Sequence, residues 1–203
     1  MQTKLSPIGT VLKELSLFEM EYVYNQHMKH DFPLSEINPL TMIKKLHKKG
    51  EYIGFGLFED DSLRSYGLFV PSPSKVILLD YLAVLPQYRQ SGFGSVFLSD
   101  LRNFNHIYDG VIIEVEDPEY SLTNEEHQMQ MKRIAFYEKN GFIMTTIKSI
   151  QFNVNYLVMY LPLNGLPLEE FIYEELCEIY QIMFPSGKLA KKAIINKPCH
   201  IHC

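Results

Sequence analysis

The sequence has 203 residues, of which 46% are hydrophobic and 21% charged, as is typical of a single globular domain with a sizeable core. Its net charge of −5 argues against nucleic acid as a partner, because phosphate binding depends on clustered Lys and Arg. No run is apolar and long enough for a signal peptide or membrane span, and three cysteines form no disulfide framework. We therefore expect a cytoplasmic protein that does not enter a membrane.

The N-terminal part predicts two helices and a hairpin. A helix is predicted over residues 10–30, because apolar residues recur at spacings of three and four: Leu12, Leu15, Phe18 and Tyr22. A second helix is predicted over 39–49. Aromatic and β-branched runs over 51–59 and 64–70 predict two strands joined at Asp60-Asp61.

Strands and helices alternate in the central part. A continuous apolar run predicts a buried strand over 76–85, followed by an amphipathic helix over 94–105. A strand is predicted over 111–116. The next helix, over 124–139, ends at Asn140-Gly141, which is a favourable C-cap.

The C-terminal part predicts two strands, over 142–152 and 156–161, and a final helix over 168–184. Apolar residues of this helix are expected to dock on the domain or on a second subunit, which leaves a homodimer open: Phe171, Leu176, Ile179, Ile182 and Met183. The order of elements excludes an all-parallel fold and a sandwich. It predicts an α+β domain with a mixed sheet and helices on both faces.

The stretch Leu79–Gly94, LDYLAVLPQYRQSGFG, is the most informative for function. A buried strand enters a glycine turn at which a helix starts, and unpaired N–H groups there can bind phosphate. Gly92 and Gly94 let a pyrophosphate approach the backbone, and Arg89 adds positive charge. A dinucleotide fingerprint needs a third glycine where Phe97 stands, which argues against a nicotinamide cofactor.

Two motifs in this region resemble those of the GCN5-related N-acetyltransferases (GNATs). Arg89–Gly94, RQSGFG, resembles their acetyl-CoA signature, and Leu82-Ala83-Val84-x-Pro86 is similar to their fourth strand. Phe136–Phe142, FYEKNGF, resembles their second motif. The resemblance covers Leu79–Phe142, and the order of the motifs, with one strand between them, is that of the family.

The resemblance implies a GNAT fold, in which a mostly antiparallel twisted sheet splays apart between strands four and five. We expect the acetyltransferase domain over residues 1–163. A C-terminal helical extension packed on it is expected over 164–185, and a flexible tail over 186–203.

The family implies acetyl-CoA as acyl donor, an amine as acceptor and direct attack without a metal. Backbone groups of the fourth strand would pair with the pantetheine arm and amides of the turn would hold the pyrophosphate. Gln130 stands where many relatives carry an Asn that faces the pantetheine. The residues expected to bind acetyl-CoA are Leu82, Ala83, Val84, Arg89, Gln90, Ser91, Gly92, Phe93, Gly94, Ser95 and Gln130.

Tyr137 is the residue that the resemblance implies as general acid. Tyrosine is protonated at neutral pH and can supply a proton to the leaving thiolate. Glu114 and Glu116 lie two residues apart on one strand and so face the same side, which makes them catalytic candidates as the base; the alternative is a solvated strand end. Asp80 is a weaker candidate, for which a hydrogen-bonded structural role is favoured.

Four alternatives remain open. Arg133 is expected to pair with a carboxylate such as Glu126 rather than to bind a phosphate. A non-catalytic protein that binds coenzyme A as a sensor is argued against by the presence of Tyr137, and an interaction protein would bind no coenzyme A at all. Cys199–Cys203, CHIHC, has metal-ligating residue types, but a frayed chain end is favoured.

Overall fold

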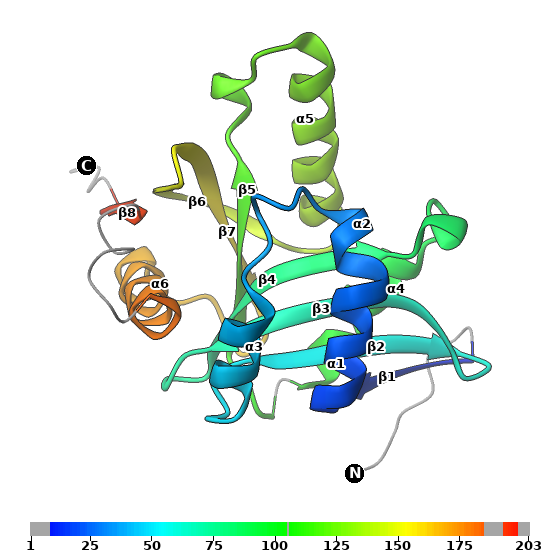
Figure 1. Cartoon of the computed structure of the whole chain (residues 1–203). Helices are drawn as coiled ribbons and strands as arrows, with labels where there is room; N and C mark the ends of the chain where they lie inside the picture. The colour runs from blue at the N-terminus through cyan, green and yellow to red at the C-terminus, as the bar shows by residue number, and fades with distance from the viewer. Residues whose placement is uncertain (1–8, 105, 185–192, 199–203) are drawn as a thin grey trace. The chain divides into compact units, whose positions relative to one another are not determined.

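The computed structural model describes residues 9–104, 106–184 and 193–198 (Figure 1). These residues fall into two compact units. The first contains the described residues up to Pro71 and the segment Leu79–Phe104. The second contains Ser72–Leu78 and the described residues after Asn105.

The first unit contains β1 (Thr10–Glu14), β2 (Ile53–Glu59), β3 (Ser62–Pro71) and residues 79–84 of β4 (Val76–Val84). Strand β2 pairs antiparallel with both β1 and β3. The predicted hairpin is confirmed. Its turn residues Asp60 and Asp61 have φ of 49° and 55°, as a two-residue turn of type I′ requires.

The predicted helix over residues 10–30 is wrong at its start. Thr10–Glu14 forms β1, and helix α1 (Leu17–Val23) begins after Ser16. Ser16 and Glu19 cap this helix reciprocally: the Glu19 amide donates to Ser16 Oγ at 3.3 Å, and the Ser16 amide donates to the Glu19 carboxylate at 2.8 Å. The Ser-x-x-Glu capping box was visible in the sequence and marks the true helix start.

The apolar spacing that predicted one helix crosses a strand and a helix. As a consequence, Phe18 and Tyr22, which were predicted to share one helix face with Leu15, are 80% and 56% exposed, whereas Leu15 is buried. After α1 the chain continues through a π-helical turn, η1 (Tyr24–Met28), into α2 (Lys29–Asp31).

Helices cover both faces of the strands of this unit, as predicted. Met20 of α1 packs against Gly54, whereas Phe97 of α4 (Phe93–Leu101) packs against Gly67 on the opposite face. In the β2–β3 register Gly54 pairs with Leu68, and Gly67 pairs with Phe55. Paired residues share a face of the sheet and successive residues alternate, so Gly54 and Gly67 lie on opposite faces. Helix α3 (Leu40–His47) lies close to its predicted range. Figure 1 shows α1, α2 and α3 in front of the strands.

The second unit is built on β5 (Gly110–Glu116), β6 (Ile143–Gln151) and β7 (Val154–Pro162), with β7 antiparallel to both others. Residues 76–78 of β4 pair parallel with Gly110–Ile112. Strand β8 (Ala193–Asn196) pairs with β6. These four residues lie in the segment expected to be a flexible tail, and it is this long-range pairing that orders them.

Two helices belong to the second unit. Helix α5 (Asn124–Lys139) has the predicted bounds: Thr123 caps its start, and Gly141, with φ of 87°, follows its C-cap. Helix α6 (Glu169–Met183) contacts β6 and β8. The apolar residues that α6 buries are Ile172, Leu176, Ile179 and Met183.

The eight strands are hydrogen-bonded in the order β1-β2-β3-β4-β5-β7-β6-β8. The pairs β1–β2, β2–β3, β5–β7, β6–β7 and β6–β8 are antiparallel, whereas β4 and β5 pair parallel. The predicted mixed, mostly antiparallel sheet is therefore confirmed. No helix of the described residues is long and apolar enough to cross a membrane.

Candidate active site

The turn that joins β4 to α4 bends through two left-handed positions, Gln90 (φ 66°) and Gly92 (φ 86°). Gly92 is the N-cap of α4, and no side chain caps this helix end. The amides of Phe93, Gly94 and Ser95 lie in the first turn, where N–H groups have no intrahelical acceptor. A Cβ added to Gly92 would meet no atom within 4 Å. The turn thus presents amide donors and a helix-dipole end to open space, which fits a pyrophosphate.

Arg89 precedes this turn and is fixed by two contacts within the first unit. Its Nη2 donates to Asp31 Oδ1 at 2.8 Å, and its Nε donates to the Val84 carbonyl at 3.3 Å. The buried Tyr66 hydroxyl donates to the other oxygen of Asp31 at 2.9 Å. Arg89 therefore ties the turn to α2 and to the end of β4. Ser91 lies exposed within the turn.

Arg64 is a residue of this region that sequence reasoning missed. Its guanidinium lies 4.1 Å from the ring centre of Tyr88 and pairs with Glu59 at 3.1 Å. Tyr88 belongs to the short helix η2 (Pro86–Tyr88) and meets the Phe93 ring edge-on at 5.9 Å. Arg64 thus packs against aromatic rings on both sides of the turn, those of Tyr88 and Phe93. No sequence pattern signals this role, because the contact joins residues more than twenty positions apart.

The segment of β4 that precedes the turn is less buried than its beginning. Leu82, Ala83 and Val84 are partly exposed, whereas Val76–Leu79 is buried. The parallel pairing with β5 covers residues 76–78 only. Backbone groups of the later segment therefore do not continue this ladder.

Asp80 lies just upstream, and its carboxylate has the partners that burial demands. Its Oδ2 accepts a hydrogen bond from the buried Tyr52 hydroxyl at 2.5 Å and another from Asn38 Nδ2 at 3.1 Å. Burial raises the pKa of the Asp80 carboxyl to about 6, although both hydrogen bonds oppose this shift.

Tyr137 lies on α5 in the second unit. Its ring meets Phe136 and Phe142 edge-on, at 5.2 Å in each case. Burial raises the pKa of the Tyr137 hydroxyl to about 12, and the nearby Arg133 opposes this shift. The group therefore holds its proton throughout the neutral range, as a general acid must.

The two glutamates of β5 have different partners. Glu114 accepts hydrogen bonds from Ser149, from Gln151 at 2.5 Å and from the Tyr180 hydroxyl at 2.5 Å. This cluster links β5 and β6 to α6. The pKa of the Tyr180 hydroxyl is raised, chiefly because the group is buried and secondly because of the negative charge of Glu114. Glu116 pairs instead with Arg133 of α5.

The expected partner of Arg133 was wrong. Its Nη1 donates to Glu116 Oε2 at 2.6 Å, whereas Glu126 accepts a hydrogen bond from the Leu122 amide at 2.9 Å. Glu126 is occupied because it belongs to the N-terminal cap of its own helix. Gln130, expected at the pantetheine, accepts a hydrogen bond from Ser121 Oγ at 2.6 Å.

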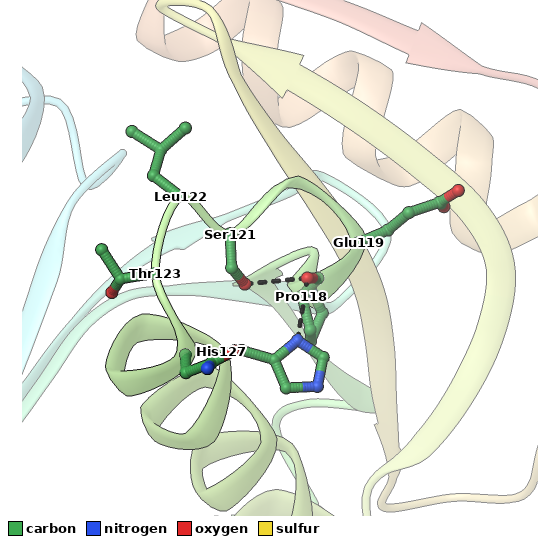
Figure 2. A pocket seen from close by; sticks show the side chains of 7 residues that line it. Pro118, Glu119, Ser121, Leu122, Thr123 and His127 are labelled. Atoms are coloured by element: carbon green, nitrogen blue, oxygen red, sulfur yellow. Dashed lines mark hydrogen bonds between the residues drawn. The ribbon is translucent and has the colours of Figure 1, made fainter.

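An open pocket of about 520 Å³ lies where β5 leads through η4 (Pro118–Tyr120) into α5 (Figure 2). Figure 2 shows Ser121 and His127 bonded to the Pro118 carbonyl, at 2.8 and 3.1 Å. None of the predicted site residues lines this pocket; its lining is Pro118, Glu119, Ser121, Leu122, Thr123, Asn124 and His127.

No group of three potential metal ligands lies together among the described residues, and Cys199–Cys203 falls outside them.

Comparisons with known proteins agree with this fold. A sequence model of the family described as acetyltransferase (GNAT) domain matches residues 45–144. A search of curated proteins finds no match.

Several solved structures superpose on the chain. A Bacteroides thetaiotaomicron protein described as a GNAT-family acetyltransferase gives a TM-score of 0.69 at 18% identity, over 86% of this chain and 98% of that one. The ribosomal-protein-S18-alanine N-acetyltransferase of Escherichia coli gives 0.55 at 20%, over 78% and 96%. A GNAT acetyltransferase of Elizabethkingia anophelis with acetyl-CoA bound gives 0.51 at 13%, over 76% and 98%. At these identities the likeness establishes the fold alone.

The mixed sheet with one parallel pair and the glycine turn at a helix start define the fold of acyl-CoA-dependent acyltransferases. The family match over residues 45–144 identifies an acetyltransferase domain of the GCN5-related N-acetyltransferase superfamily, and the chain is an N-acetyltransferase.

Proposed function

We propose that the chain takes the acetyl group from acetyl-CoA and transfers it in one direct step to an amine, either of a small molecule or of a protein. The choice of acetyl-CoA as donor rests on the start of α4 at Gly92. No side chain caps this helix end, and the space beside Gly92 is open. The Elizabethkingia anophelis relative was solved with acetyl-CoA bound, which supports the same donor here.

We assign the donor to two segments of the first unit. Amides from Gln90 to Ser95 bind the pyrophosphate, and backbone groups of Leu82 and Val84 pair with the pantetheine arm as an added strand would. Arg89 supplies positive charge and, through Asp31, keeps the turn in place. Bound acetyl-CoA supplies a thioester, whose carbonyl carbon accepts the amine nitrogen.

In the second unit, Tyr137 acts as the acid that gives its proton to the departing sulfur. Such a positioned acid contributes about 10²–10⁴-fold to rate. Gln130 is proposed to contact the pantetheine once released from Ser121. Glu114 and Glu116 remain proposals as the base, although each carboxylate already accepts hydrogen bonds.

The setting proposed is the reducing cytoplasm, in agreement with a free Cys177 and few cysteines in all. We further propose that residues 1–163 form the catalytic domain and that 164–185 form an extension docked on it. We also propose a homodimer.

Thermal unfolding with and without acetyl-CoA tests the donor. Ligand at about 100 times its Kd adds roughly 2.7 kcal/mol, which corresponds to a rise in Tm of about 5–11 °C for a chain of this size. Coenzyme A should give a comparable shift, and release of its thiol in the presence of an amine then measures turnover. No shift at millimolar acetyl-CoA would instead favour the interaction-protein alternative.

A further inference from the structure

The turn proposed to bind pyrophosphate contains a residue in a conformation that its side chain disfavours. Gln90 has φ of 66°, in the left-handed region that residues other than glycine rarely adopt. Such a position persists only where the surrounding structure holds the backbone in place. Two aromatic rings bracket the left-handed positions: Tyr88 precedes them, Phe93 follows them, and the two rings meet edge-on at 5.9 Å. A group that fixes both rings therefore fixes the turn.

Arg64 of β3 contacts both rings through its guanidinium. The group lies 4.1 Å from the ring centre of Tyr88 and 5.9 Å from that of Phe93. A flat guanidinium over an aromatic face gains cation–π attraction, and the gain is larger where water is excluded. The Arg64 side chain is only 12% exposed, so the contact is largely shielded from water. The rings on either side of the left-handed positions thus share one buried cation.

The backbone of Arg64 reaches the start of the turn as well. Successive residues of β2 pair with Ser65 and then with Leu63, so Arg64 between them is the extra residue of a β-bulge. Its carbonyl accepts a hydrogen bond at 2.9 Å from the amide of Leu85, the residue that follows β4. Bulges redirect a side chain and are frequent beside active sites. Arg64 therefore contacts the chain both where it enters the turn and where it leaves it.

The hydrogen bonding of Arg64 is incomplete for a side chain so buried. Its Nη2 lies 3.1 Å from Glu59 Oε2 and donates to the Glu59 carbonyl at 3.4 Å. Its Nε is buried and has no hydrogen-bond partner among the described residues. A buried donor that is left unpaired costs stability. The guanidinium therefore occupies the position that covers the Tyr88 ring rather than the one that would satisfy all of its own N–H groups.

We propose, resting on the acetyl transfer argued above, that Arg64 is a positioning residue for the donor. By holding Tyr88 and Phe93, it keeps the turn Arg89–Gly94 in the conformation whose amides bind the pyrophosphate. Arg64 acts through the turn and touches no reacting atom. It consequently sets the affinity for coenzyme A and its acetyl ester, and leaves the chemical step unchanged.

Titration calorimetry with coenzyme A tests this inference without turnover. Arg64→Met retains the aliphatic stem and removes both the flat cation and the unpaired Nε. Its Kd for coenzyme A should be about tenfold that of the wild type. Arg102→Met makes the same change at an exposed position at the other end of α4, and it should leave Kd within about twofold. Calorimetry measures the Kd of the folded molecules, so a loss of stability alone would leave it unchanged.

Two further variants separate stacking from charge and from folding. Arg64→Lys retains the charge and can still pair with Glu59, but its compact ammonium lacks the flat face that covers Tyr88. It should therefore also raise Kd several-fold. Tyr88→Leu removes the ring itself and should raise Kd to a similar extent. Adding Arg64→Met to Tyr88→Leu should then change Kd little further, because both act on one contact.

The outcomes separate this inference from the proposed function. An unchanged Kd in Arg64→Met, full affinity in Arg64→Lys, or full additivity with Tyr88→Leu overturns the positioning role, while binding of coenzyme A by the wild type still supports acetyl transfer. If Arg64→Met does not fold, Arg64→Lys and Tyr88→Leu decide the question. A wild-type chain that does not bind coenzyme A would overturn the acetyl-transfer proposal and this inference with it.

Discussion

Arg89 Nη2 donates a hydrogen bond to Asp31 Oδ1 at 2.8 Å, and the Asp31 side chain is only 2% exposed. The pair joins the last residue of α2 to the first residue of the acetyl-CoA signature. Arg89 itself is 54% exposed, so its other face remains open to a ligand. A helix that lies between β1 and β2 in sequence thus fixes the position of the turn that is proposed to bind pyrophosphate.

Asp31→Asn should therefore weaken acetyl-CoA binding as well as stability. We expect a loss of about 1–2 kcal/mol in the free energy of unfolding, less than for a fully buried pair because Arg89 is half exposed. The Kd for acetyl-CoA should rise several-fold, measured by titration calorimetry. In a cycle with Arg89→Gln, the second substitution should cost little once the first is present; full additivity would contradict the coupling.

Gly92→Ala tests the backbone of the turn. The position has φ of 86° and free space around it, so the cost is conformational strain of about 1 kcal/mol rather than a clash. Gly165 has the same φ and the same free space, which makes Gly165→Ala a matched control. Both variants should lose similar stability in thermal unfolding, but only Gly92→Ala should weaken acetyl-CoA binding.

Tyr137→Phe should lower kcat by about 100-fold with acetyl-CoA affinity nearly unchanged. The pKa of about 12 means that the wild-type hydroxyl stays protonated up to about pH 11. Tyr137 should therefore cause no fall in kcat between pH 7 and 10. Stopped-flow or steady-state thiol release measures both effects; equal kcat in the variant would show that another group is the acid.

Asp80→Asn should stabilise the protein at neutral pH. The folded carboxyl has a pKa of about 6, against about 3.9 in an unfolded chain, so the folded state binds more protons between these values. Stability is consequently lost as pH rises from about 4 to 6, and the cost persists above. Removing the charge should add about 1–3 kcal/mol to the free energy of unfolding at pH 7.5 and nothing at pH 4, as denaturant titration would show.

Glu114→Gln distinguishes a structural from a catalytic glutamate. Its hydrogen bonds to Ser149, Gln151 and Tyr180 connect three elements of the second unit, so substitution should cost about 1–3 kcal/mol of stability. A purely structural Glu114 would leave turnover per folded molecule near that of the wild type. Tyr180→Phe should reproduce the loss of stability, whereas a large fall in kcat without a loss in Tm would make Glu114 the base.

Local signals in the sequence predicted much of the fold. The bounds of α5 agree with the prediction because Thr123, Asn140 and Gly141 act on the backbone within a few residues. The hairpin turn at Asp60-Asp61 and the glycine turn at Gly92 were predicted for the same reason: their conformations depend on the residues themselves.

The sequence predicted which charged residues of the site need partners, but not which residues those partners are. The sequence identified Asp80 as a carboxylate in need of partners and Arg133 as an ion-pairing residue. It did not indicate that Tyr52 and Asn38 would serve Asp80, or that Glu116 would serve Arg133. Such partners lie many residues apart, and composition contains no information on them.

By itself, then, the sequence determined the family motifs, the turns and the helix ends, which arise from short-range backbone preferences. Only the tertiary structure decided that Thr10–Glu14 is a strand and that Ala193–Asn196 is another, because each is stabilised by hydrogen bonds to a distant strand. It also decided which donors each carboxylate receives. That property depends on how many donors the folded chain brings to each acid, and Asp80 receives both of its donors on one side.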